Sequence, residues 1–140
     1  MRYLIDTNIF MQIISENSLL SESVRQILED YENIICISSE SIKETIHLLQ
    51  TGKVKTKKWK ITRDVIDFIE KELGYTIKYV KKEHLLTFAA LELVEGHNDP
   101  SDRLIIAQAI TEKMPVISSD NKFKHYRKQK LQLIFNEKYH

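Results

Sequence analysis

The chain alternates short runs of consecutive apolar residues with longer segments in which apolar residues recur every three to four positions. Apolar runs bounded by polar residues are typical of buried strands, and the longer periodic segments are typical of amphipathic helices. The runs that predict strands are residues 2–5, 34–38, 75–80, 115–118 and 131–135. The segments that predict helices are residues 6–14, 20–31, 38–52, 62–74, 82–96 and 99–114.

The order of these elements predicts the fold class. The expected strands are apolar throughout rather than on alternate positions, which indicates burial on both faces of a sheet. Because they alternate with helices, we expect an α/β fold of three layers, with a mostly parallel central sheet of four to five strands and helices on both faces. The length of 140 residues, with no repeat and no linker, predicts a single domain spanning 1–140.

Composition places the chain among ordinary globular proteins, with 42% hydrophobic and 29% charged residues. The single cysteine, Cys36, excludes an internal disulfide and favours a reducing compartment. No apolar run is long enough to span a bilayer, and Met1 leads directly into a strand-like run rather than a leader. The sequence therefore predicts a cytoplasmic protein without a membrane anchor.

Charge is distributed unevenly although the net charge is only +1. Residues 52–63 and 121–130 are rich in lysine and arginine and contain no acid. Basic segments around an acidic pocket suit a ligand with a polyanionic backbone. A solvated lysine-rich surface is the alternative interpretation of each segment.

Acidic residues follow the expected strands at places that a parallel sheet brings together. Asp6 comes directly after the first strand, and Asp120 comes shortly after the fourth. Glu44 lies in the helix after the second strand, and Asp99 and Asp102 open the last long helix. Open α/β sheets bind ligands at the carboxyl ends of their strands, so these acids are candidates for one site.

Each acid also has a purely structural interpretation. Asp6 and Asp99 are suited to capping the helices that they precede, and Asp102 is favourable in a first helical turn. Asp120 lies in "SSDN", which is typical of a turn, and a glutamate in mid-helix such as Glu44 usually faces solvent. Their joint occurrence at matching places in the topology favours a shared role.

Gathered carboxylates predict metal chemistry. Hard divalent cations such as Mg²⁺ and Mn²⁺ prefer oxygen ligands, and clustered carboxylates repel one another unless a cation neutralises them. A metal held in this way supports hydrolysis of phosphodiesters, and such a site needs no serine, cysteine or histidine nucleophile. The residues alone therefore predict metal-dependent phosphoryl chemistry.

With these acids placed, the chain resembles the PIN-domain proteins, and most closely the VapC-type toxins of toxin–antitoxin pairs. The resemblance covers nearly the whole chain and rests on "LIDTNIF", "SIKETIHLL", "HNDPSDRLIIAQA" and "VISSDNKF", of which the first and third are specific. The family pattern, carried over position by position, implies a catalytic set of Asp6, Glu44, Asp102 and Asp120, in which the three aspartates bind the metal. Supporting roles are implied for Thr7, Asn8, Asp99 and Ser118. Glu40 remains an alternative to Glu44, because residues four apart share one helix face.

The resemblance also implies an activity and partners. It implies a Mg²⁺- or Mn²⁺-dependent endoribonuclease, a homodimer and a cognate antitoxin protein. The expected RNA contacts are Lys55, Lys57, Lys58, Arg103, Lys122 and Lys124. Trp59, Phe123 and Tyr126 are candidates for stacking on unpaired bases, with packing in the core as their competing role.

Two other classes of α/β protein with acidic sites fit these residues less well. A phosphatase with an aspartyl nucleophile needs Asp-x-Asp after the first strand, and Thr7 and Asn8 follow Asp6 here. A receiver domain needs a phosphoacceptor after the third strand, where this chain has Lys81 and Lys82. A free-standing RNA-processing nuclease of the same family and a catalytically inactive RNA- or protein-binding module remain as alternatives to a toxin.

Overall fold

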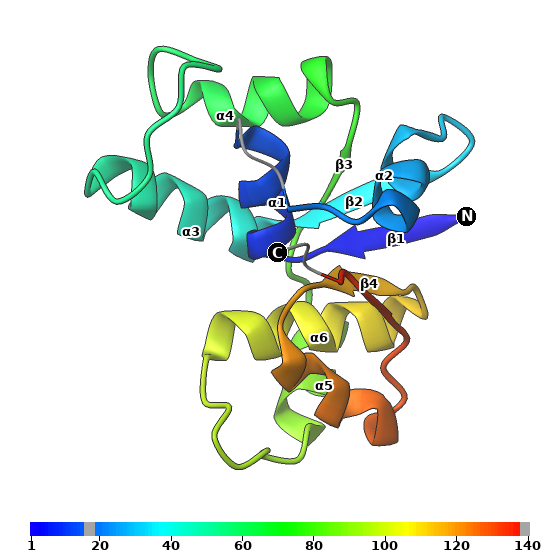
Figure 1. Ribbon diagram of the computed structural model, residues 1–140. Helices are drawn as coiled ribbons and strands as arrows, with labels where there is room; N and C mark the ends of the chain where they lie inside the picture. Colours follow the sequence, from blue (N-terminus) through cyan, green and yellow to red (C-terminus); the bar gives the residue numbers. More distant parts are fainter. Residues whose placement is uncertain (16–18, 138–140) are drawn as a thin grey trace.

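A five-stranded sheet in which all strands are parallel forms the centre of the protein (Figure 1). The computed structural model describes residues 1–15 and 19–137. The strands are β1 (Arg2–Ile5), β2 (Ile34–Ser38), β3 (Thr76–Lys78), β4 (Val116–Ser118) and β5 (Leu133–Phe135). Their order in the sheet is β3-β2-β1-β4-β5. The predicted fold class, with a parallel sheet of four to five strands between helices, is confirmed.

Helices cover both faces of the sheet. They are α1 (Thr7–Ile14), α2 (Glu22–Glu29), α3 (Ser39–Gln50), α4 (Asp64–Asp67), the π-helix η1 (Phe68–Glu72), α5 (Lys82–Ala90), α6 (Pro100–Glu112) and the 3₁₀-helix η2 (Asn121–Gln129). Figure 1 shows α1, α3 and α4 on one side of the sheet and α5 and α6 on the other. Alternate strand residues serve the two sides: Ile5 and Ile117 belong to the core beneath α1, and Leu4 and Val116 to the core beneath α6. Burial on both faces explains the continuous apolar runs.

The helix expected over residues 82–96 is shorter in the structure. It ends at Ala90, and Leu91 adopts an extended conformation with φ −64° and ψ 133°. The chain then turns back, with the Val94 carbonyl accepting from the His97 amide at 3.0 Å, and leads into α6. Leu91 and Val94 continue the helical spacing of apolar residues, so the periodicity did not reveal the end.

Two further segments differ from the expected elements. The helix expected over residues 62–74 consists of the short α4, which continues as the π-helix η1. Residues 121–129, for which no element was expected, form the 3₁₀-helix η2. Phe123 and Tyr126 are three residues apart and therefore share one side of a helix with three residues per turn, and both are fully buried. Burial of these two aromatic side chains in the core explains how a lysine-rich segment becomes helical.

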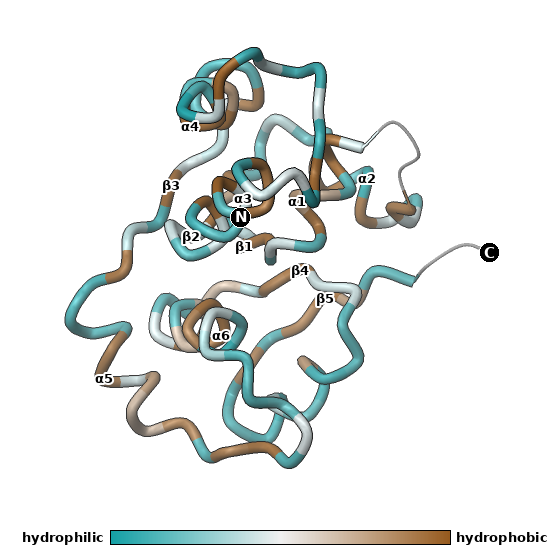
Figure 2. The backbone as a smooth tube through the Cα atoms, turned by 90° about the vertical axis from the view of Figure 1, so that its left-hand side faces the viewer, coloured by the Kyte–Doolittle hydropathy of each residue, from teal (hydrophilic) through white to brown (hydrophobic). Residues whose placement is uncertain are grey.

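Helix α5 exposes apolar side chains. Leu85 and Leu86 are 51% and 61% exposed, because the side of α5 that packs on α6 carries His84, Thr87 and Phe88 instead. Figure 2 shows hydrophobic positions along α5 and the segment that follows it, at the periphery of the molecule. Within residues 1–15 and 19–137, no helix has the length and apolar character needed to cross a membrane.

A charged network connects β1 and β3 to α5 and α6. Glu112 at the end of α6 contacts Arg2 (3.4 Å), Lys78 (3.1 Å) and His84 (2.9 Å). The hydrogen bond from His84 is the main reason that the pKa of Glu112 falls to about 2, and Lys78 and Arg2 lower it further. Because this pKa lies below that of an unfolded glutamate, the network stabilises the fold above about pH 4.5 and loses this effect as the pH falls toward 2.

We expect Glu112→Gln to lower the free energy of unfolding by about 1–3 kcal/mol at pH 7, because the substitution leaves three cationic or donor groups without their carboxylate. Urea unfolding followed by circular dichroism measures the change, and Glu95→Gln, at an exposed position, is the matched control. Equal stability of Glu112→Gln and Glu95→Gln would show that the network contributes nothing.

Candidate metal centre

The candidate site lies at the carboxyl edge of β1 and β4, which are neighbours in the sheet. Ile5 pairs with Ile117, so the residues that follow them, Asp6 and Ser118, lie side by side. Ser118 Oγ donates to Asp6 Oδ2 at 2.5 Å. The backbone of Asp6 is fixed as well, because its amide donates to the Ile117 carbonyl at 3.2 Å. Sheet register therefore places the first acid.

Asp6 caps α1, and its surroundings also disfavour the ionised form of its carboxyl group. Its Oδ1 accepts from the Ile9 amide at 2.9 Å, which caps α1, and its side chain is buried. The pKa of Asp6 is raised to about 7, mainly by burial and to a smaller extent by the carboxylates of Asp102 and Asp120, against the lowering effect of its two hydrogen bonds. A role in capping alone does not explain why this buried carboxyl group lies near the carboxylates of Asp102 and Asp120.

The opening of α6 divides two roles between its aspartates. Asp99 is the cap, since its Oδ1 accepts from the amides of Ser101 (2.9 Å) and Asp102 (3.2 Å). Asp102 instead presents its carboxylate to the interior, where one oxygen lies 3.4 Å from His97 Nε2. Burial is the main cause that raises the pKa of Asp102, and Asp99 and Asp120 add to it. The structure thus separates the structural acid from the candidate ligand.

Glu44 faces the same site from α3. Thr7 Oγ1 donates to Glu44 Oε1 at 2.8 Å and lies 3.0 Å from Ser41 Oγ. Burial raises the pKa of Glu44, as do the aspartates that open α6, while the Thr7 hydrogen bond lowers it. Glu40, one turn earlier, forms an ion pair with Lys43 at 3.0 Å. This geometry favours Glu44 over Glu40 as the helix acid of the site.

Asp120 completes the group from the loop after β4. Its amide donates to Ser118 Oγ at 3.0 Å, and its Oδ1 accepts from the Lys122 amide at 2.9 Å, which begins η2. Donor atoms of Asp120, Asp102 and His97 all lie within 4.8 Å of one another. Asn8, the remaining member of the "DTN" motif, is exposed on the first turn of α1.

His97 is a residue of this site that sequence reasoning missed. It is buried and adjoins Asp102, yet no role was expected for it. The only available signal was its place two residues before the "DPSD" opening of α6. A lone histidine in a connecting segment carries no periodicity, so its burial depends entirely on the tertiary structure.

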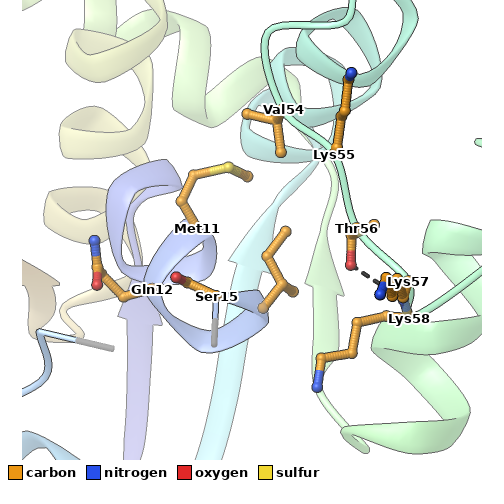
Figure 3. Close-up of a pocket in the computed structure, with 9 residues that line it drawn as sticks. Met11, Gln12, Ser15, Val54, Lys55, Thr56, Lys57 and Lys58 are labelled. Carbon is orange, nitrogen blue, oxygen red and sulfur yellow. Dashed lines mark hydrogen bonds between the residues drawn. The ribbon is translucent and has the colours of Figure 1, made fainter. Parts of the chain in front are cut away.

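The basic segment of residues 52–63 lies at the far end of α1 from Asp6. Three of its lysines, Lys55, Lys57 and Lys58, are exposed and line a pocket of about 780 Å³. Met11 and Val54 contribute apolar walls to this pocket (Figure 3). The lysines therefore adjoin a surface that leads away from the acids, rather than forming a rim directly around them.

The other residues expected to contact RNA are placed differently. Phe123 and Tyr126 are fully buried, so of the two roles considered for them the structure supports packing in the core and not stacking on bases. Trp59 is half-buried, with its ring 5.1 Å from that of Phe68. The Arg103 guanidinium lies over another ring, that of Phe88, at 5.0 Å, a contact within the protein.

Two lysines of the second basic segment lie on η2, directly after Asp120. Lys122 and Lys124 are exposed, and Lys124 Nζ lies 3.9 Å from the centre of the Phe135 ring. Their helix begins directly after Asp120, so this basic segment adjoins the candidate site.

The donor set fits a hard divalent cation. The acids offer carboxylate oxygens from three separate chain segments, and their raised pKa values arise from burial and mutual repulsion, which a cation would relieve. A second cluster, Glu83, His84 and Glu112, does not fit a metal. His84 Nδ1 accepts from the Lys81 amide, so the ring proton lies on Nε2 and is donated to Glu112, which leaves neither nitrogen with a lone pair for an ion.

Comparisons with known proteins agree with this fold. The family model described as PIN domain matches residues 3–129, and the chain therefore belongs to the PIN domain family. No curated protein matches the sequence.

Solved structures show the same fold at low sequence identity. A VapBC complex from Rickettsia felis bound to promoter DNA contains a chain with TM-score 0.67 and 21% identity, covering 98% of this chain and 100% of that one. A DNA-bound VapBC from Salmonella typhimurium gives TM-score 0.68 and 16% identity, with 96% and 98% covered. A VapBC toxin–antitoxin complex from Mycobacterium tuberculosis gives TM-score 0.64 and 19% identity, with 96% and 98% covered.

Proposed function

We propose that the protein is a metal-dependent endoribonuclease that acts as the toxin of a toxin–antitoxin pair. The observation that carries the proposal is the convergence of Asp6, Glu44, Asp102 and Asp120 at one edge of the sheet, with pKa values of the first three raised by burial and by neighbouring acids. Membership of the PIN domain family supports nuclease chemistry. The VapBC complexes that share the fold support an antitoxin partner.

Asp6, Asp102 and Asp120 would hold the cation in this proposal. A bound Mg²⁺ or Mn²⁺ would offset their charges, polarise a phosphodiester oxygen and activate the attacking water. Ser118 keeps the Asp6 carboxylate in place, and its hydroxyl is in turn held by the Asp120 amide. The ligands are thus oriented by hydrogen bonds before substrate arrives, which lowers the cost of reorganisation.

Glu44 would take the proton from the attacking water. One carboxylate oxygen is occupied by Thr7, which leaves the other to face the site. Its raised pKa makes it a stronger base than an exposed glutamate. Lys122 and Lys124 would contact the RNA backbone near the acids, and Lys55, Lys57 and Lys58 would contact more distant phosphates.

A cleavage assay on circular RNA tests the proposal. Circular RNA has no ends, so only an endonuclease opens it. We expect purified protein to open a structured circular RNA with Mg²⁺ or Mn²⁺ and to leave it intact with EDTA. Protein that binds this RNA but never opens it would instead support an inactive binding module. An adjoining reading frame whose product co-purifies with the protein and blocks cleavage would distinguish a toxin from a free-standing nuclease.

The two glutamates of α3 provide a matched pair. We expect Glu44→Gln to lower kcat for RNA cleavage by about 10²- to 10⁴-fold, the usual contribution of a general base. Glu40→Gln, one turn away, should stay within about twofold of the parent, since Glu40 pairs with Lys43. Single-turnover cleavage rates measure both variants. A larger loss in Glu40→Gln than in Glu44→Gln would reverse the assignment.

A further inference from the structure

His97 is a buried histidine at the candidate metal centre that the proposed mechanism does not use. It lies in the connection between α5 and α6 and is 2% exposed. Its ring is flanked by two aromatic side chains, with centroid distances of 6.1 Å to Phe123 and 5.4 Å to Tyr126. This packing fixes the plane of the imidazole and so determines where its nitrogens point.

The two nitrogens of His97 have different partners. Nδ1 lies 2.6 Å from the hydroxyl oxygen of Tyr126, a short hydrogen bond. Either atom can be the donor, and the tautomer that a metal would select has Nδ1–H donating to the Tyr126 oxygen, which leaves the lone pair of Nε2 for the ion. Metal-binding histidines are oriented in just this way, with the other ring nitrogen donating to a fixed acceptor.

Nε2 of His97 makes a long hydrogen bond of 3.4 Å to Asp102 Oδ2. A cation bound between the two groups would replace this weak contact. Two donors that each bind one ion at about 2.1 Å lie about 3.0–3.4 Å apart, as geometry requires. The Asp120 carboxylate belongs to the same group of donor atoms, all within 4.8 Å of one another.

We propose that His97 supplies a nitrogen ligand to the metal centre through Nε2, and that the site therefore prefers Mn²⁺ to Mg²⁺. This inference rests on the proposed function and adds a ligand to the carboxylate set. Imidazole binds transition metals well, whereas Mg²⁺ prefers oxygen donors. A nitrogen ligand therefore increases the affinity of the site for Mn²⁺ more than its affinity for Mg²⁺. Tyr126 acts as the positioning residue that holds the ring.

Pulsed electron paramagnetic resonance of the protein loaded with one equivalent of Mn²⁺ tests the proposal directly. A nitrogen ligand produces ¹⁴N coupling to the Mn²⁺ electron spin. We expect this coupling in the parent protein, and we expect ¹⁵N labelling of histidine to replace it with ¹⁵N coupling. This measurement needs no substitution and so does not depend on a variant folding.

Substitutions then assign the nitrogen. We expect His97→Gln to abolish the coupling and to weaken Mn²⁺ binding at least tenfold, while Mg²⁺ binding changes less than threefold. His47→Gln is the matched control, because His47 is exposed on α3, and it should keep both the coupling and the affinity. Isothermal titration with each metal gives the two dissociation constants.

The outcomes separate this inference from the proposed function. Mn²⁺ bound without ¹⁴N coupling, in a protein that still cuts RNA, would overturn the role of His97 and leave the nuclease intact. Coupling that survives in His97→Gln would overturn the assignment as well. A protein that binds neither Mn²⁺ nor Mg²⁺ would overturn both proposals.

Discussion

Asp102→Asn and Asp6→Asn are each expected to lower RNA cleavage by about three orders of magnitude or more, because ligands that act as a unit fail together when one is lost. Asparagine matches aspartate in shape and removes only the charge. Asp102 is not a cap in this structure, since Asp99 accepts the amide hydrogen bonds at the start of α6. A loss of RNA cleavage in Asp102→Asn would therefore reflect the chemistry of the site rather than the loss of a helix cap.

Initial rates on the circular RNA, at saturating Mg²⁺ and then at saturating Mn²⁺, measure this effect. Asp67→Asn is the control, because Asp67 is an exposed acid on α4 that pairs with Lys71 at 3.6 Å. It should cut RNA at the parental rate. Parental rates in both Asp6→Asn and Asp102→Asn would mean that the acid cluster has no part in cleavage.

The second large effect is a gain in folding stability, whereas the first is a loss of cleavage activity. We expect Asp6→Asn to make the metal-free protein more stable at pH 8. Burial, together with two neighbouring acids, raises the pKa of Asp6 from 3.8 to about 7. The native state therefore holds this proton more tightly than the unfolded state, and the parent loses stability as the pH rises from about 4 to 7. A shift of about three pKa units corresponds to at most about 4 kcal/mol.

Asparagine carries no charge and escapes this loss. Its side-chain oxygen can still accept from the Ile9 amide, and its side-chain NH₂ can donate to Ser118, so the contacts around position 6 are retained. Urea unfolding in EDTA at pH 5 and pH 8 measures the effect, and the stabilisation should be larger at pH 8. Excess Mn²⁺ should stabilise the parent and not the variant, since only the parent keeps its ligand set. Equal pH dependence in the two proteins would show that Asp6 ionises normally.

Most of the fold could be predicted from the sequence because local patterns report it. Continuous apolar runs such as residues 34–38 appear only where a strand is covered on both faces. A capping residue marked the start of some helices, as Asp99 does for α6. The end of α5 was missed because Leu91 continues the apolar spacing after the backbone has left the helix.

The acids of the candidate site could be proposed from their places after the strands, but not their individual environments. Asp99 and Asp102 are three residues apart in one motif, and only the structure shows that the first caps α6 and the second faces inward. Glu40 and Glu44 were equivalent by spacing and are distinguished by Thr7 and Lys43. Phe123 and Tyr126 looked available for stacking until their burial in the core was known.

By itself, then, the sequence determined which residue types follow which strands, since hydrophobic periodicity and capping are properties of neighbouring residues. The tertiary structure alone decided which of those side chains are buried, which form hydrogen bonds or ion pairs, and which lie close to residues from other strands. His97 illustrates the difference: its neighbours Tyr126 and Asp120 come from chain segments more than twenty residues away. Burial and charge coupling depend on such distant contacts, and no local pattern encodes them.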